Sequence, residues 1–170
     1  FITNKDITKR GYWERRLQIE NWDNYLTKRS NTTVTEISFL SSDNKNVGDY
    51  VFQSFTSLTT VKGLTDYRTI GIGSFKDCTN LADISLNDIK RIERDAFKNC
   101  ITLNNINLSN IEYIGDGAFD GCTSLRNVSF GTNLKYIGKN AFENNMTISQ
   151  EQSDKLYLYE NSNVNYNSDK

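Results

Sequence analysis

A phenylalanine that follows a small or aliphatic residue recurs along the chain every 22 or 23 residues, and its copies are Phe52, Phe75, Phe97, Phe119 and Phe142. An apolar residue stands five positions before each copy: Val47, Ile70, Ile92, Ile114 and Ile137. Another stands six positions after it: Leu58, Leu81, Leu103, Leu125 and Ile148. A unit of this length cannot bury its own apolar residues. The pattern therefore predicts a solenoid whose stacked turns share one core.

A short alternation of polar and apolar residues follows each leucine and predicts one parallel strand per turn. The clearest strands are expected at 83–86, 105–108 and 127–130, with weaker copies around Ile37 and Val61. The segment around each phenylalanine is expected to form a tight turn or a short helical turn. Four glycines each precede a phenylalanine by four residues, and we expect them at positive φ: Gly48, Gly71, Gly115 and Gly138.

The two ends of the chain lack the repeat. Residues 12–28 contain good helix formers and an imperfect apolar stripe, which predicts a helix that caps the first turn. A partner-binding or membrane-surface helix is the alternative there. Residues 155–159 alternate like a strand. We therefore expect a helical cap over 1–33, about five repeats over 34–148, and a C-terminal strand with a frayed tail over 149–170. The predicted fold class is an α+β solenoid.

Composition excludes several classes of partner. The formal net charge of −1 favours neither nucleic acid nor an acidic membrane surface, although it leaves a local basic patch possible. No apolar run is long enough to span a bilayer. The chain begins at Phe1, without a signal-peptide pattern, which suggests a processed or trimmed fragment. We expect a monomer that binds a protein partner.

Candidate catalytic chemistry is sparse. The chain has no histidine, which removes the commonest general base and metal ligand. Cys78, Cys100 and Cys122 occur once per turn without any C-x-x-C pair, so we expect three free, buried thiols rather than a metal site. A disulfide between adjacent turns is the alternative. Carboxylates such as Asp83 and Glu93 have no convergent partner, and we predict no enzyme activity, cofactor or metal.

The phased pattern I-G-x-x-A-F-x-x-C-x-x-L-x-x-I-x-L resembles the BspA-like, or Treponema-type, class of leucine-rich repeats. The matching residues are Ile114, Gly115, Ala118, Phe119, Cys122, Leu125, Val128 and Phe130. The resemblance covers about residues 34–148 and implies a right-handed leucine-rich-repeat coil. Proteins of this class occur on bacterial and protist cell surfaces and are thought to bind host proteins, matrix components or other microbes. The resemblance thus implies a secreted or cell-surface adhesion module.

Stacked turns place outward residues in columns, and two surfaces are candidates for partner binding. The first, the strand face, consists of Glu36, Ser38, Thr60, Lys62, Asp83, Ser85, Asn105, Asn107, Asn127 and Ser129. Its alternative is a solvated sheet face that binds nothing. In the wider leucine-rich superfamily the strand face usually carries the partner.

The second surface, the aromatic and basic strip, lies just before the phenylalanines. It consists of Arg68, Lys90, Arg91, Glu112, Tyr113, Lys135 and Tyr136. Arg91 is expected to stack on Tyr113, and Tyr113 on Tyr136, while Lys90, Glu112 and Lys135 alternate in charge. The alternative is a ladder that only stabilises the surface.

Two other roles remain open beside adhesion. The chain could be a structural spacer or fragment within a larger surface protein. It could also be an intracellular recognition or effector protein, since free cysteines are compatible with a reducing cytosol.

Overall fold

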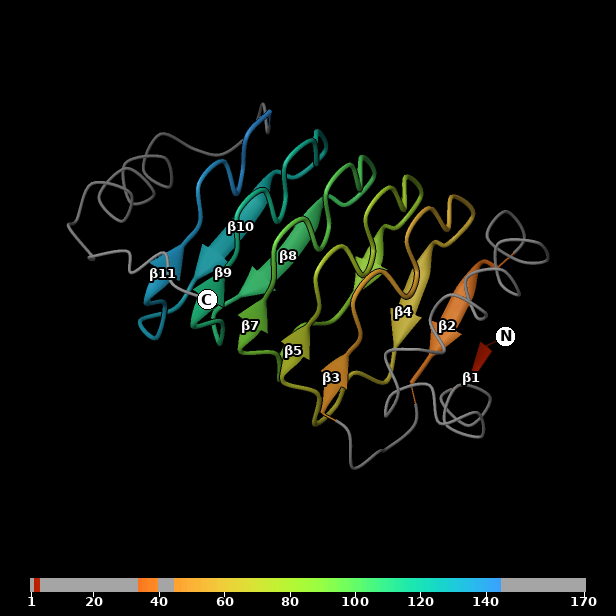
Figure 1. Ribbon diagram of the computed structural model, residues 1–170, viewed down its shortest axis with the longest axis horizontal. Helices are drawn as coiled ribbons and strands as arrows, with labels where there is room; N and C mark the ends of the chain where they lie inside the picture. The colour runs from red at the N-terminus through yellow and green to blue at the C-terminus, as the bar shows by residue number, and fades with distance from the viewer. Residues whose placement is uncertain (1, 4–33, 40–44, 145–170) are drawn as a thin grey trace.

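The computed structural model describes residues 2–3, 34–39 and 45–144. These residues coil into stacked turns whose short strands form two rows along the long axis of the molecule (Figure 1). All strand pairs among the described residues are parallel, and partners come from successive turns. The structure thus confirms the parallel-strand solenoid predicted from the repeat.

The first row of strands contains two sheets. Its strands are β1 (Ile2–Thr3), β2 (Glu36–Ser38), β4 (Thr60–Lys62), β6 (Asp83–Ile84), β8 (Asn105–Leu108) and β10 (Asn127–Phe130). β1, β2, β4 and β6 form one sheet, and β8 pairs with β10 in another. Just before the break between them, the Thr102 hydroxyl donates to the backbone carbonyls of Thr79 and Leu81. The strand expected at 83–86 is shorter than predicted, since β6 ends at Ile84.

A second strand in each turn forms a separate five-stranded sheet, where the repeat predicted only one strand per turn. Its members are β3 (Asn46–Val47), β5 (Thr69–Ile70), β7 (Arg91–Ile92), β9 (Tyr113–Ile114) and β11 (Tyr136–Ile137). The second residue of each strand is buried and the first is at least partly exposed. Two residues are too short a span for alternation to be visible in a sequence, which explains why the prediction missed them.

The described residues contain no helix, so this part of the chain consists of strands and turns and the predicted α+β class is not supported here. The segments around the phenylalanines form turns rather than helical turns. The helix expected at 12–28 and the strand expected at 155–159 lie outside the described residues.

The core is built around the recurrent phenylalanine. Five rings stack on one another at centroid distances of 5.0 to 5.5 Å and interplanar angles of 6 to 17°. The backbone N–H of Phe97 donates to the Ala118 carbonyl of the next turn at 2.8 Å, and that of Phe119 donates to the Ala141 carbonyl at 2.7 Å. Because Ala96, Ala118 and Ala141 are small and buried, they let successive turns approach to this distance.

Left-handed backbone occurs on both sides of each phenylalanine. The residues two positions before it have φ between 55 and 59°: Tyr50, Gly73, Asp95, Gly117 and Asn140. The residues two positions after it have φ between 61 and 74°: Ser54, Asp77, Asn99, Gly121 and Asn144. Most are Gly, Asn or Asp, the residues that tolerate this region best. They let the chain bend twice within a few residues.

The glycines expected at positive φ have a different role. None of Gly48, Gly71, Gly115 and Gly138 lies in the left-handed region. A Cβ added to Gly71 would lie 2.6 Å from the Val47 carbonyl oxygen of the preceding turn, and one added to Gly138 would collide with the Asp116 backbone nitrogen. Gly71, Gly115 and Gly138 are therefore required by the close approach of neighbouring backbones.

The cysteine column is buried, as predicted. Cys78, Cys100 and Cys122 are free thiols. Each Sγ donates to a backbone carbonyl of the preceding turn, those of Phe52, Phe75 and Phe97, at 3.0 to 3.2 Å. Burial is the main reason why the pKa of Cys78 and Cys122 rises to about 12 and that of Cys100 rises well above its ordinary value. The thiolate, which reacts and binds metals, is therefore suppressed at neutral pH.

Replacing Gly138 by alanine should destabilise the fold, because the new Cβ meets backbone that cannot rotate away. We expect a loss of about 1–3 kcal/mol in the free energy of unfolding, the range for overpacking. The exposed neighbour Lys139→Ala should change it by less than about 0.5 kcal/mol. Urea denaturation of both variants measures the difference, and equal stabilities would contradict the close-approach explanation.

The thiols should be protected in the folded protein. With iodoacetamide at pH 8, well below pKa values of about 12, native protein should gain no adduct, whereas protein unfolded in urea should gain three. Intact-mass spectrometry counts the adducts. A mass two daltons low before alkylation would reveal a disulfide, and adducts on the native protein would contradict the burial of this column.

Candidate functional site

The strands β7, β9 and β11 bring together three residues of the aromatic and basic strip. Arg91 pairs in register with Tyr113, and Tyr113 with Tyr136. The Arg91 guanidinium carbon lies 4.0 Å from the centroid of the Tyr113 ring. The rings of Tyr113 and Tyr136 are stacked at 4.5 Å with an interplanar angle of 5°. The predicted stacking is confirmed, and Glu93 also holds Arg91 through an ion pair of 3.1 Å.

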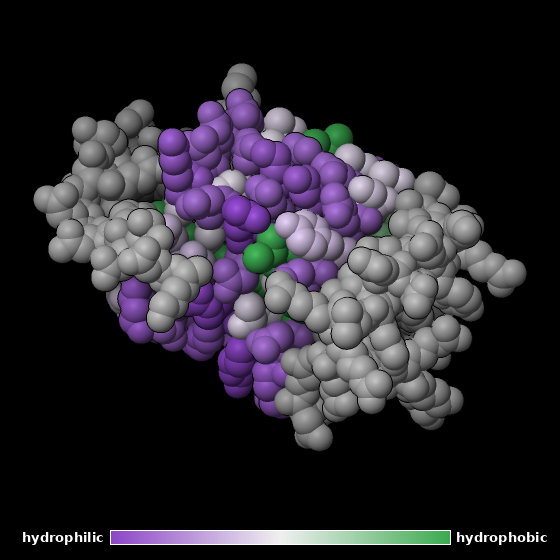
Figure 2. All heavy atoms as spheres, in the orientation of Figure 1, coloured by the Kyte–Doolittle hydropathy of each residue, from purple (hydrophilic) through white to green (hydrophobic). Residues whose placement is uncertain are grey.

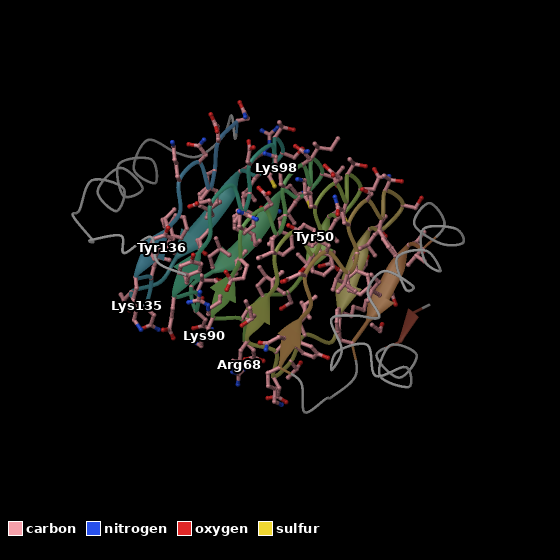
Figure 3. The ribbon with its side chains drawn as sticks, in the orientation of Figure 1. Tyr50, Arg68, Lys90, Lys98, Lys135 and Tyr136 are labelled. Atoms are coloured by element: carbon pink, nitrogen blue, oxygen red, sulfur yellow. The ribbon has the colours of Figure 1, made fainter. Side chains whose placement is uncertain are left out.

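The charged residues beside this stack follow the predicted alternation only in part. Lys135 forms an ion pair of 2.7 Å with Glu112 of the preceding turn. Lys90 instead donates from Nζ to the Asn110 carbonyl, and Arg68 donates to the Tyr67 and Asp88 carbonyls. The alternation therefore yields one cross-strand ion pair rather than two. Figure 3 shows Arg68, Lys90 and Lys135 along one edge of the ribbon, near the starts of β5, β7 and β11.

The ionisation of the strip follows from these contacts. The hydrogen bond from Lys135 is the main cause that lowers the pKa of Glu112, so this carboxylate stays charged at neutral pH. Partial burial is the main cause that raises the pKa of Tyr113, so its phenol stays neutral. The strip thus presents fixed positive charges beside neutral aromatic rings.

The strand face is assembled in two blocks. Parallel register aligns Glu36 with Thr60 and Asp83, and Ser38 with Lys62, on β2, β4 and β6. On the other block it aligns Asn105 with Asn127 and Asn107 with Ser129. Ser85 is exposed but follows the end of β6. The predicted columns are thus confirmed within each block, whereas the break after β6 interrupts them.

The strand face carries little charge beyond one ion pair. Lys62 contacts Glu36 at 2.7 Å, and this hydrogen bond is the main cause that raises the pKa of Lys62. Asp83, Asn105 and Asn107 are exposed. The face offers hydrogen-bonding groups but no aromatic anchor. Figure 2 shows that the visible surface of the described residues is largely hydrophilic.

Two exposed residues of the first full turn were missed by the sequence reasoning. Lys45 precedes Asn46 of β3 and so heads the column that contains Arg68 and Lys90. Tyr50 is 39% exposed at φ 57°, with its ring against Gly73 of the next turn. Lys45 stands seven residues before Phe52 and Tyr50 two residues before it, and the same offsets in the later repeats would have placed both residues in their columns. The weak copy of the motif in this turn concealed them.

Among the described residues, no group of three or more Cys, Asp or Glu is placed to hold a metal ion. No helix there is long and apolar enough to cross a membrane.

Comparisons with solved structures show the same architecture. The chain is 29% identical to the T. pallidum leucine rich repeat protein TpLRR, with a TM-score of 0.62 over 67% of this chain and 55% of that one. A leucine-rich repeat protein from Bacteroides ovatus is also 29% identical, with a TM-score of 0.52 over 62% of this chain and 30% of that one. The chain thus spans between 30% and 55% of these proteins.

A more distant structure shares the fold. A leucine rich cell surface protein from Faecalibacterium prausnitzii is 24% identical, with a TM-score of 0.60 over 67% of this chain and 31% of that one. No curated protein matches the chain at a significant level.

The family comparison covers most of the chain. The family described as BspA type leucine rich repeat region matches residues 28–165 in six copies, a wider range than the five turns over 34–148 counted from the sequence. The stacked parallel turns, the phenylalanine column and this match together establish the family, and the protein belongs to the BspA-type leucine-rich repeat proteins.

Proposed function

We propose that this chain is the protein-binding part of a cell-surface or secreted protein with an adhesion or host-interaction role. Proteins of the BspA-type repeat family are typically binding modules rather than enzymes. One structural relative is described as a cell surface protein. The regular columns of outward side chains in this solenoid suit recognition of a partner over several turns.

The stack of Arg91, Tyr113 and Tyr136 is the observation that carries the proposal. Tyrosine and arginine dominate the binding energy of protein interfaces because they combine large contact area with hydrogen bonding. Here Arg91 is held by both Tyr113 and Glu93, and Tyr113 lies flat against Tyr136. Since these side chains are already ordered, binding loses less conformational entropy than it would with mobile side chains. The aromatic and basic strip is therefore the first candidate surface.

The strand face is the second candidate surface. Its support is the register that aligns polar residues on β2, β4 and β6 and again on β8 and β10. These short side chains form hydrogen bonds but bury little area, so a partner there would depend on many weak contacts. A substitution on this face should weaken binding less than one in the strip.

Paired triple variants separate the two surfaces once a partner has been captured on the immobilised chain. Arg91→Ser, Tyr113→Ser and Tyr136→Ser together should lower the affinity for the partner at least about 100-fold, because hot-spot residues each contribute more than about 1 kcal/mol to the binding free energy. Asp83→Ala, Asn105→Ala and Asn127→Ala together should change affinity by less than about 5-fold. Surface plasmon resonance gives both values, and circular dichroism checks folding. If neither folded variant weakens the partner, the surface assignment is wrong.

Location requires a separate measurement. Antibodies against this chain should label intact cells of the source organism, and external protease should remove the label. Labelling that requires permeabilised cells would favour the intracellular recognition role. Surface labelling without any captured partner would favour a structural spacer.

A further inference from the structure

Three cations of successive turns form an uninterrupted column at the starts of β3, β5 and β7. The residues of this cationic column are Lys45, Arg68 and Lys90. The Arg68 backbone N–H donates to the Lys45 carbonyl at 2.6 Å, and the Lys90 N–H donates to the Arg68 carbonyl at 2.8 Å. Adjacent members are therefore one strand spacing apart, about 4.8 Å along the solenoid. Each is partly or fully exposed.

No ion pair among the described residues involves this column, although the Glu112 carboxylate of the next turn interacts electrostatically with Lys90. The ion pairs found there include the neighbours Arg91, held by Glu93, and Lys135, held by Glu112. The nearby Asp88 carboxylate accepts instead from the Asp66 backbone N–H at 3.3 Å. Positive charge therefore concentrates on this edge, although the whole chain has a net charge of −1.

Backbone contacts orient two of the cationic heads without neutralising them. One terminal nitrogen of Arg68 donates to the Tyr67 and Asp88 carbonyls, and Lys90 Nζ donates to the Asn110 carbonyl. A guanidinium has five N–H donors and an ammonium has three, so donors remain for an anion on both residues. Like charges on adjacent strands repel each other. A ligand that carries several negative charges would relieve this repulsion along the whole column.

The surroundings of the column restrict the class of ligand. Both faces of Tyr113 are occupied, by Arg91 and by Tyr136, so this ring offers no free face on which a nucleic acid base could stack. β5 and β7 each pair with a strand on both sides, so a peptide strand cannot be added between the turns of the column. In an extended acidic peptide, side chains on one face repeat at about 6.6–6.8 Å, out of step with turns spaced at about 4.8 Å.

We propose that the cationic column binds a linear sulfated polysaccharide, whose sulfate groups contact Lys45, Arg68 and Lys90 on successive turns. Sulfate esters remain ionised at all physiological pH values and accept paired hydrogen bonds from a guanidinium. Their several positions on each sugar unit let the chain match the spacing of the column. Recognition by charge requires no pocket and no aromatic platform. The cationic column shares Arg68 and Lys90 with the aromatic and basic strip but does not include the stack of Arg91, Tyr113 and Tyr136, and heparin binding can be measured without a protein partner.

Heparin binding by charge-matched variants tests the site. Lys45→Gln, Arg68→Gln and Lys90→Gln together should weaken heparin binding about 10-fold or more at 0.15 M salt. The control variant Lys76→Gln, Arg126→Gln and Lys139→Gln removes the same number of positive charges from positions outside the cationic column and both candidate surfaces. It should change affinity by no more than about 3-fold. Calorimetry gives the affinities, and urea denaturation confirms that both variants fold.

Competition experiments identify the ligand class. Chemically desulfated heparin, polyglutamate and single-stranded DNA should each compete much less well than heparin. Equal losses in both triple variants would show that only net charge matters and would overturn the site. Polyglutamate or DNA that competes as well as heparin would overturn the assignment to sulfated polysaccharide, and so would a wild-type chain that does not bind heparin.

The outcome is independent of the protein-binding proposal. The double variant Tyr113→Ser and Tyr136→Ser should retain heparin binding within about 3-fold, because it removes no charge. The triple variant of the cationic column should likewise retain binding to a protein partner that contacts the stack of Arg91, Tyr113 and Tyr136. Loss of heparin binding in the tyrosine variant would contradict the separation of the two sites.

Discussion

Contact between successive turns is the constraint on which the rest of this structure depends. Each turn is too short to enclose a core, so its apolar residues are buried only when the next turn lies against it. Three kinds of contact hold the turns together: parallel strand pairing in both rows, stacking of the phenylalanine rings, and backbone hydrogen bonds through the turns around them. All three require the same spacing. The small residues directly before Phe75, Phe97, Phe119 and Phe142 satisfy that requirement, and so do Gly71, Gly115 and Gly138.

The same constraint explains why the interior of the described turns is filled and why their outward side chains form columns. Inward positions are filled by rings, aliphatic side chains and thiols, and the cysteines there are bound to backbone carbonyls and kept protonated by burial. Outward positions repeat at the spacing of the turns, so whatever residue occupies a column is displayed several times in a row. The residue type at one outward position of each turn therefore sets the chemistry of a whole column.

Two strips on the second row of strands illustrate this effect. Aromatic and guanidinium groups in register produce the ordered stack of Arg91, Tyr113 and Tyr136. One position earlier, Lys45, Arg68 and Lys90 place positive charge along the edge, until Glu112 reverses the sign in the fourth turn. A net charge near zero conceals this local concentration, because acidic residues elsewhere on the chain offset it. The overall charge therefore does not describe the charge on any one face of this solenoid.

The sequence by itself determined the stacked-turn architecture, the phenylalanine and cysteine columns, and the members of the aromatic strip. These follow from periodicity, because residues in phase must share a column once turns stack. Only the tertiary structure decided the second strand in each turn, since two-residue strands have no periodicity to read. It also showed that left-handed backbone lies beside the phenylalanine and that Gly71 and Gly138 serve close packing instead. These features depend on contacts between turns. The same contacts determine that Lys90 donates a hydrogen bond to the Asn110 carbonyl, whereas Lys135 forms an ion pair with Glu112.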